Sequence, residues 1–142
     1  MNASPSCRKF WFLAATLVGS LGCGGQTLYQ VKGTVAYKDE ADVSVLANGL
    51  VLFDPVDAEV KVSARGEIKP DGSFRMSTFR EGDGVMPGKY RVMLSPPAFR
   101  GKRNEVRPEL FDPRFEDFET SGLDITVTGP VINYVITVDK PR

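Results

Sequence analysis

The stretch VSARGEIKPDGSFRMST, residues 62–78, decides the fold of this chain. Apolar and polar residues alternate in both of its arms, with Ile68 on the apolar side before the middle and Phe74 and Met76 after it. Alternation with a period of two indicates β-strands that are buried on one face. Between the arms, PDG at residues 70–72 predicts a tight hairpin turn in which the glycine supplies a positive φ.

The same alternation recurs on both sides of this stretch. Short alternating or apolar runs, separated by Gly, Pro, Asn and Asp, occupy residues 30–37, 48–54, 88–94, 123–128 and 131–138. Together with the two arms above, they predict an all-β fold, a seven-stranded antiparallel Greek-key sandwich. In the strongest run, 88–94, Tyr90 and Val92 are expected to face the core from a central strand. In the last run, the residues expected to point inward are Ile132, Tyr134, Ile136 and Val138.

Two connections are longer than strand turns require. The first is KDEADVSVLAN, residues 38–48, and the second is residues 95–122, with four prolines, four phenylalanines and mixed charge. Long loops in compact domains are often functional. Two interpretations of the second loop stay open, because its aromatic side chains either cap the end of the sandwich or form a surface for a partner. The residues of that candidate partner surface are Phe99, Phe111, Phe115, Phe118 and Arg114.

The first 22 residues predict a secretory signal peptide. Arg8 and Lys9 are the only charged residues before Lys32, and the nine uncharged residues FWFLAATLV follow them. A basic start, a short apolar core and a small-residue end are typical of such signals. The apolar run is shorter than the roughly 20 residues that a membrane-spanning helix needs.

Cys23 follows this segment in GSLGC, which resembles the box that ends bacterial lipoprotein signals. There the cysteine takes a lipid and becomes the first residue of the mature chain, and two or three acyl chains then hold a protein on a membrane. The match departs from the usual box, because Leu21 is two places before the cysteine and Ser20 occupies the third. Ordinary cleavage near Gly22, which leaves a soluble secreted protein, is the alternative. Cys7 lies in the removed part, so lipidation explains the single remaining cysteine.

These observations divide the chain into a lipoprotein signal peptide (1–22), a flexible tether (23–29) and one β-sandwich domain (30–142). Cleavage before Cys23 leaves 120 residues, with 16 basic and 18 acidic side chains. That length supports one core, and the balanced charge argues against nucleic acid as a partner. We expect an exported protein anchored through its lipid in the bacterial cell envelope, on the periplasmic or outer-membrane side, or otherwise secreted.

Several stretches of the domain resemble one known family. VKGTVAYKD, NGLVLFDP, GEIKPDGSFRMST, EGDGVMPGKYRVML and SGLDITVTGPVINYVITV are similar to small bacterial lipoproteins with a carboxypeptidase regulatory-like domain. The resemblance covers nearly all of the mature chain, and its most specific motifs lie within residues 66–92. It implies a transthyretin-like (prealbumin-like), immunoglobulin-like sandwich. The first connection departs from the family by being longer.

Composition excludes most catalytic chemistry. The chain contains no histidine, which removes Ser-His-Asp and Cys-His systems and the commonest general base. Glu81 and Asp83 lie in a glycine-rich loop but fall short of the roughly six to eight oxygens that calcium takes. We therefore expect no metal, no cofactor and no enzyme activity, although a carboxylate pair such as Glu116 and Glu119 leaves an enzyme as the third hypothesis.

Two other hypotheses come first. The domain is expected to be a non-catalytic interaction or scaffold module of the cell envelope, with a protein or glycan partner. The alternative is a small-molecule or glycan binding protein that uses residues 95–122. Exposed aromatic side chains beside a concave polar patch would favour the alternative.

Replacing Cys23 tests the anchor. Cys23→Ser removes the thiol that takes the lipid, so we expect the variant either to leave the membrane fraction or to keep its signal uncut. Fractionation of cells and the mass of the purified chain measure both outcomes. A Cys7→Ser variant is the matched control and should behave as the natural chain. Membrane association of a normally cleaved Cys23→Ser variant would contradict the anchor.

Overall fold

The alternating runs of the sequence form strands in the computed structural model, which describes residues 25–57 and 59–142. Cys23 and the predicted signal peptide lie outside these residues. No helix in the described part of the chain is long and apolar enough to span a membrane. The elements, in chain order, are β1 (Val31–Tyr37), the short helix η1 (Ser44–Leu46), β2 (Leu50–Pro55), β3 (Ala64–Glu67), β4 (Ser73–Arg75), β5 (Gly88–Ser95), the short helix η2 (Pro113–Glu116), β6 (Leu123–Val127) and β7 (Val131–Val138).

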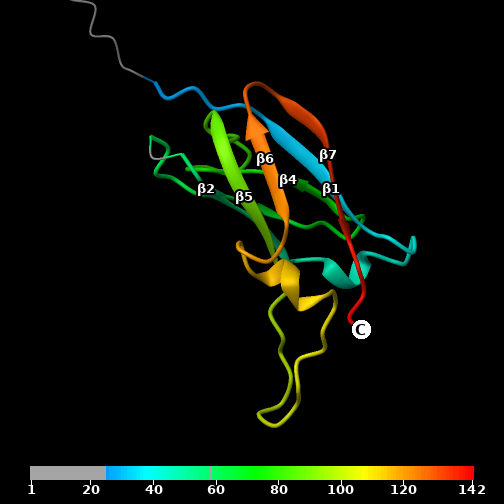
Figure 1. Ribbon diagram of the computed structural model, residues 1–142. Helices are drawn as coiled ribbons and strands as arrows, with labels where there is room; N and C mark the ends of the chain where they lie inside the picture. Colours follow the sequence, from blue (N-terminus) through cyan, green and yellow to red (C-terminus); the bar gives the residue numbers. More distant parts are fainter. Residues whose placement is uncertain (1–24, 58) are drawn as a thin grey trace, which may run out of the picture.

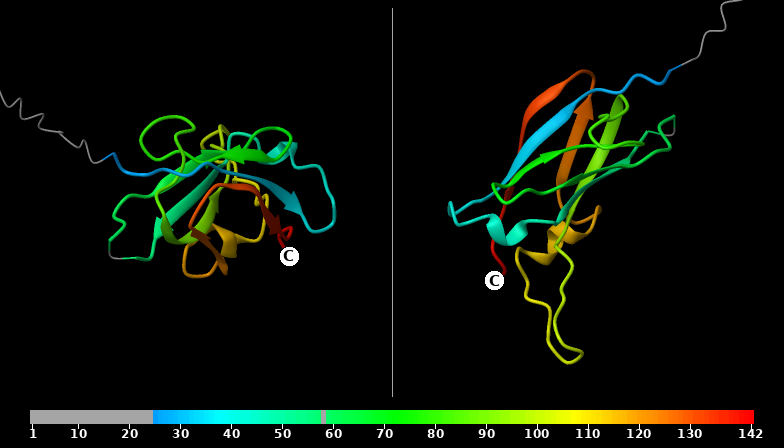
Figure 2. Two further views of the ribbon diagram at one scale, coloured as in Figure 1. Left: turned by 90° about the horizontal axis from the view of Figure 1, so that it is seen from above. Right: turned by 180° about the vertical axis from the view of Figure 1, so that it is seen from behind.

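The strands form two sheets (Figures 1 and 2). One sheet has the order β4-β1-β7 and the other the order β3-β2-β5-β6. The prediction of an all-β fold is therefore confirmed. The core lies between the sheets and consists of the inward side chains of the alternating runs, because every second residue of a strand points to the same face.

One strand pair contradicts the expectation of a wholly antiparallel sandwich. β1 and β7 run parallel, side by side, with Thr34 opposite Val135 and Tyr37 opposite Val138. A tight hairpin imposes antiparallel pairing only on strands that follow each other closely. Because almost the whole domain lies between β1 and β7, the alternation within each run carries no information about their relative direction.

The stretch that decides the fold forms a corner between the two sheets. Gly72 has the predicted positive φ, +82°, and the Gly72 amide donates to the Lys69 carbonyl over 2.9 Å. The arms then separate, because β3 pairs with β2 and β4 pairs with β1. The Lys69 amide donates to the Ser73 carbonyl beside the turn, and a bridge between Arg65 and Ser77 joins the arms farther along. The predicted hairpin is thus a turn that carries the chain from one sheet to the other.

A row of aromatic rings connects the sheets. Tyr134 of β7 lies edge-on to Phe74 of β4 and to Phe53 of β2, with centroids 6.5 and 6.2 Å apart. Phe53 in turn lies 5.8 Å from Tyr90 of β5. The row needs Gly33 in β1, since a Cβ there would lie 2.5 Å from the Phe74 ring and 2.0 Å from the Tyr134 carbonyl oxygen. Burial of Tyr134 and, to a lesser degree, the nearby Asp124 charge raise its pKa to about 12, because both disfavour the phenolate.

A register shift changes the start of β7. Val31 pairs with Val131, but Gly33 pairs with Tyr134, so β7 contains one extra residue. Such a bulge reverses the faces of the residues before it. The expectation that Ile132 points inward is therefore wrong: its side chain is 67% exposed, and Val131 packs on the core instead. Tyr134, Ile136 and Val138 lie on the core side as expected.

Truncation of Tyr90 tests the central position of β5. Tyr90 and Val92 are buried, and β5 lies between β2 and β6, which confirms the sequence prediction. Tyr90→Ala should lower the free energy of unfolding by about 3 kcal/mol or more, measured by chemical denaturation. Tyr90→Phe removes only the hydroxyl that donates to the Met86 carbonyl over 2.9 Å and should cost about 1 kcal/mol. A loss below about 1 kcal/mol for Tyr90→Ala would contradict this packing.

Candidate functional site

The long loop between β5 and β6 extends away from the sandwich. It leaves the end of the molecule opposite to residues 25–29, where the described chain begins, and both side views show this arrangement (Figures 1 and 2). The loop consists of two parts with different surroundings. We call residues 98–109 the tip and residues 110–121 the foot.

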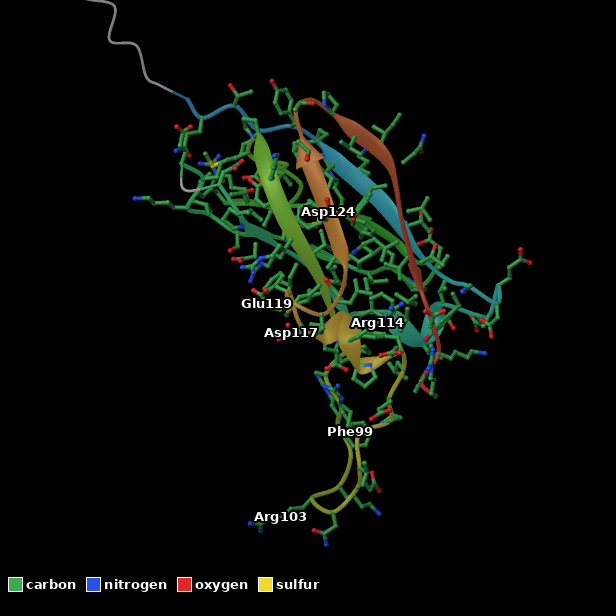
Figure 3. The ribbon with its side chains drawn as sticks, in the orientation of Figure 1. Phe99, Arg103, Arg114, Asp117, Glu119 and Asp124 are labelled. Atoms are coloured by element: carbon green, nitrogen blue, oxygen red, sulfur yellow. The ribbon has the colours of Figure 1, made fainter. Side chains whose placement is uncertain are left out.

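The tip is exposed along its whole length. Phe99 is 43% exposed and Val106 is 90% exposed, and Figure 3 shows Arg103 at the far end with Phe99 nearer the sandwich. The tip carries four basic residues and two acidic ones. Arg107 is bound by Glu116 of the foot, over 2.6 Å. The remaining basic side chains of the tip, for which no ion pair is found among the described residues, are Arg100, Lys102 and Arg103.

The foot packs against the sandwich. Phe111 and Phe115 are buried in the main core, with ring centroids 6.4 Å apart in an edge-on arrangement. Proline at the start of η2 and the Asp112 side chain, which accepts from the Arg114 amide over 3.0 Å, fix the short helix that places Phe115. Phe111 and Phe115 therefore do not belong to an exposed partner surface, and they cap the end of the sandwich.

Arg114 and two backbone contacts hold the foot to the ends of strands. The Arg114 guanidinium lies 4.5 Å from the Phe115 ring centroid and donates to Asp139 over 2.8 Å. The Tyr37 hydroxyl donates to the Leu110 carbonyl over 2.6 Å, and the Asp112 amide donates to the Asp139 carbonyl. Arg114 thus has a structural contact, and the sequence alone did not distinguish this role from binding.

Phe118 and the two candidate carboxylates lie among arginines. Phe118 is half-buried, 6.0 Å from the Arg91 guanidinium. Arg91 also binds Glu119 and, over 2.8 Å, Asp54. Glu119 and Glu116 are therefore engaged by different arginines. This arrangement supports ion pairing of the foot rather than a pair of carboxylates that share one cleft.

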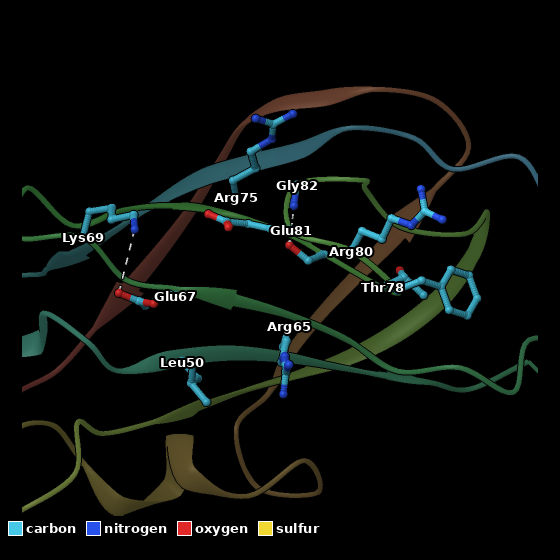
Figure 4. Close-up of a pocket in the computed structure, with 11 residues that line it drawn as sticks. Leu50, Arg65, Glu67, Lys69, Arg75, Thr78, Arg80, Glu81 and Gly82 are labelled. Carbon is cyan, nitrogen blue, oxygen red and sulfur yellow. Dashed lines mark hydrogen bonds and ion pairs between the residues drawn. The ribbon is translucent and has the colours of Figure 1, made fainter.

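A second candidate site is a groove at the corner between the sheets, which we call the corner groove. Its volume is about 800 Å³, and its walls come from β3, from β4 and from residues 77–82. Figure 4 shows Lys69 and Glu67 at one end and Arg80 at the other, with Arg65 and Arg75 on opposite sides. The lining residues are Leu50, Arg65, Glu67, Lys69, Arg75, Ser77, Thr78, Phe79, Arg80, Glu81 and Gly82.

The wall formed by residues 77–82 is held by Asp83, which follows it in the chain. Its carboxylate accepts the amides of Thr78, Phe79 and Arg80 over 2.7 to 2.9 Å. Burial raises the pKa of Asp83, but these three amides outweigh it and hold the pKa below its ordinary value. The described residues contain no cluster of three or more His, Cys, Asp or Glu suited to a metal ion. Asp83 is thus occupied by its own loop.

Two further contacts hold this wall, one within it and one to the residue before β1. The Gly82 amide donates to the Ser77 hydroxyl over 2.7 Å, and the Gln30 side chain donates to the Gly82 carbonyl over 2.8 Å. The wall presents Phe79, which is 58% exposed. Sequence reasoning missed this groove, although Phe79 and Arg80 directly follow the predicted strand SFRMST and precede the acidic glycine-rich loop.

Comparisons of the chain with protein family models, with curated proteins and with solved structures found no match.

The division of the loop into tip and foot has a measurable consequence. Phe111→Ala removes a buried ring and should lower the free energy of unfolding by about 3 to 5 kcal/mol. Phe99→Ala, the matched truncation in the exposed tip, should cost about 0.5 kcal/mol or less. Chemical denaturation of both variants measures the difference. Equal losses would show that the tip is part of the core.

Proposed function

We propose that this protein is a non-catalytic lipoprotein of the cell envelope and that its sandwich is an interaction module. In this proposal the domain is a transthyretin-like Greek-key sandwich of the carboxypeptidase regulatory-like kind, anchored through Cys23. The tip is the part that binds a partner protein. The sequence motifs and the two-sheet all-β architecture support the proposed type of domain. The position of the tip supports its proposed role as the binding surface.

The position of the tip carries the argument. Residues 25–29 lie at one end of the sandwich and the tip projects from the other (Figures 1 and 2). Because Gly25 follows Cys23 by only two residues, a lipid on Cys23 would place the membrane near the first end. The tip would then point away from that membrane, toward a partner in the surrounding compartment.

The chemistry of the tip suits an acidic protein surface. The Phe99 ring packs over Gly101 within the tip, yet Phe99 and Val106 still expose apolar area. Arg100, Lys102 and Arg103 surround them with positive charge. Aromatic residues and arginine are enriched at protein interfaces, and complementary charge raises the association rate. An interface of this kind would bury Phe99 and Val106 and place the cations at its rim.

The foot lowers the cost of such binding. Phe111 and Phe115 hold the base of the loop in the core, and the Arg107–Glu116 ion pair connects the tip to the foot. At the far end, the Glu105 amide donates to the Lys102 carbonyl over 2.9 Å, which closes a turn. A loop that is already held at its base loses less conformational entropy when it binds.

The alternative, glycan or small-molecule binding by residues 95–122, has less support. The corner groove is lined by residues outside that segment. The tip extends from the sandwich as a loop. Its residues do not line the corner groove or the smaller hollow near Lys38 and Asp139. Glycan binding is therefore better argued at the corner groove than at the loop.

Shortening the tip tests the proposed function. Residues 98–109 are replaced by a short Gly-Ser linker in the intact lipoprotein, while the foot stays unchanged. The sandwich should remain folded, because the removed residues are exposed. Capture of the partner from a cell-envelope extract, which holds both soluble and membrane proteins, should fall at least tenfold. Quantitative mass spectrometry of the captured proteins and a thermal melt measure the two effects.

Two further variants make the result specific. The first is a triple variant that keeps the length of the loop but reverses its charge, Arg100→Glu with Lys102→Glu and Arg103→Glu. It should reduce capture in the same way. Phe79→Ala, an exposed phenylalanine on another surface, should leave capture unchanged. Full capture by the shortened, folded protein would contradict the proposal.

A further inference from the structure

We infer that the corner groove is a binding site for an acidic saccharide, a sugar chain that carries carboxylate groups. The inference goes beyond the proposed function, because the groove lies at the corner between the sheets and shares no residue with the tip. Its volume of about 800 Å³ is within the range of ligand sites, roughly 300 to 1,000 Å³.

The charges of the groove point to an anionic ligand. Four basic residues line it against two acidic ones, and Glu67 is 3.8 Å from Lys69. No carboxylate of the described residues forms an ion pair with Arg65, Arg75 or Arg80. Guanidiniums offer planar donors that match the geometry of a carboxylate. The Arg75 Nε–H donates to the Gln30 side-chain oxygen over 3.0 Å, which leaves its two terminal nitrogens for a ligand.

The spacing of the cations points to an extended ligand. Lys69 and Arg80 lie at opposite ends of the groove, and Arg65 and Arg75 lie on opposite sides of it (Figure 4). A single small anion would be held best by cations that surround one point. A chain with a carboxylate on successive units would instead reach cations at both ends.

Phe79 distinguishes a sugar from a simple polyanion. Phe79 is 58% exposed and lines the groove. The amides of Phe79 and Arg80 both donate to the fixed Asp83 carboxylate, so the ring lies on a wall that is already ordered. An exposed aromatic face offers an apolar surface on which the C–H groups of a sugar ring can stack, while nearby polar groups bind its hydroxyls.

The remaining lining of the groove combines apolar and polar groups. Leu50 adds apolar surface, and the Ser77 hydroxyl, which accepts from the Gly82 amide, keeps its own proton for donation. A ligand with both apolar C–H faces and hydroxyl acceptors makes use of such a lining. Cations, a stacking ring and mixed walls in one groove are together the chemistry of an acidic saccharide.

Titration calorimetry on the full chain tests the inference. The probes are a uronic-acid tetrasaccharide, a neutral tetrasaccharide with the same linkage, and inorganic phosphate. We expect the uronic-acid probe to bind, with an affinity that falls as salt is added because the contacts are solvent-exposed charges. The neutral probe should bind at least tenfold more weakly. Phosphate should not displace the uronic-acid probe when both supply the same total negative charge.

Variants locate the binding. Arg65→Ala and Arg80→Ala should each weaken the uronic-acid probe about tenfold, and Phe79→Leu should weaken it severalfold because it keeps apolar area but removes the ring. Arg103→Ala and Phe99→Ala, the matched changes in the tip, should have no effect. Thermal melts confirm that every variant is folded.

Three results would overturn the inference. The first is that the uronic-acid probe does not bind, and the second is that the neutral probe binds as tightly as the uronic-acid probe. The third is that the tip variants weaken the uronic-acid probe as much as the groove variants do. Competition by phosphate at equal charge would also overturn it, because the groove would then bind anions in general. The proposed function fails separately, since it depends on the tip and is measured by capture of a protein.

Discussion

The space above Gly33 is the constraint on which the rest of the structure depends. The ring of Phe74 and the backbone of Tyr134 occupy the place where a side chain of β1 would point. This close approach lets β4, β1 and β7 form one sheet while their aromatic rings reach Phe53 and Tyr90 in the other. Any side chain at position 33 would separate the strands that carry the row, because protein interiors leave no room for displaced groups.

The inward faces of most strands follow from local alternation, so the sequence predicts them well. Tyr90, Phe74 and Met76 are buried where the pattern places them. The alternation does not show which distant strands pair with each other or in which direction. The parallel direction of β1 and β7, the bulge that exposes Ile132 and the separation of β3 from β4 all depend on contacts between residues far apart in the chain. Period-two patterning describes one strand at a time and does not contain that information.

The candidate sites differ in the same way. Composition identifies residues 95–122 as unusual, but four phenylalanines look alike in a sequence, and only the fold separates the buried Phe111 and Phe115 from the exposed Phe99. The corner groove is less visible still, since its walls come from β3, from β4 and from the loop that Asp83 holds. The Asp83 carboxylate accepts three backbone amides of that loop. Phe79 lies in that loop, and only its exposure in the structure identifies it as a candidate binding residue.

The pairing of β1 with β7 sets a condition on how the chain folds. Residues 31–37 find their longest partner about a hundred positions later, at residues 131–138, while β4 offers β1 only three paired residues. Contacts between such distant segments raise the contact order and slow folding, because a large loop must close before the contacts form. The three-stranded sheet therefore cannot be completed until β7 is available. Until then the chain lacks Tyr134, the ring that joins Phe74 to Phe53, so the aromatic row that connects the two sheets stays incomplete.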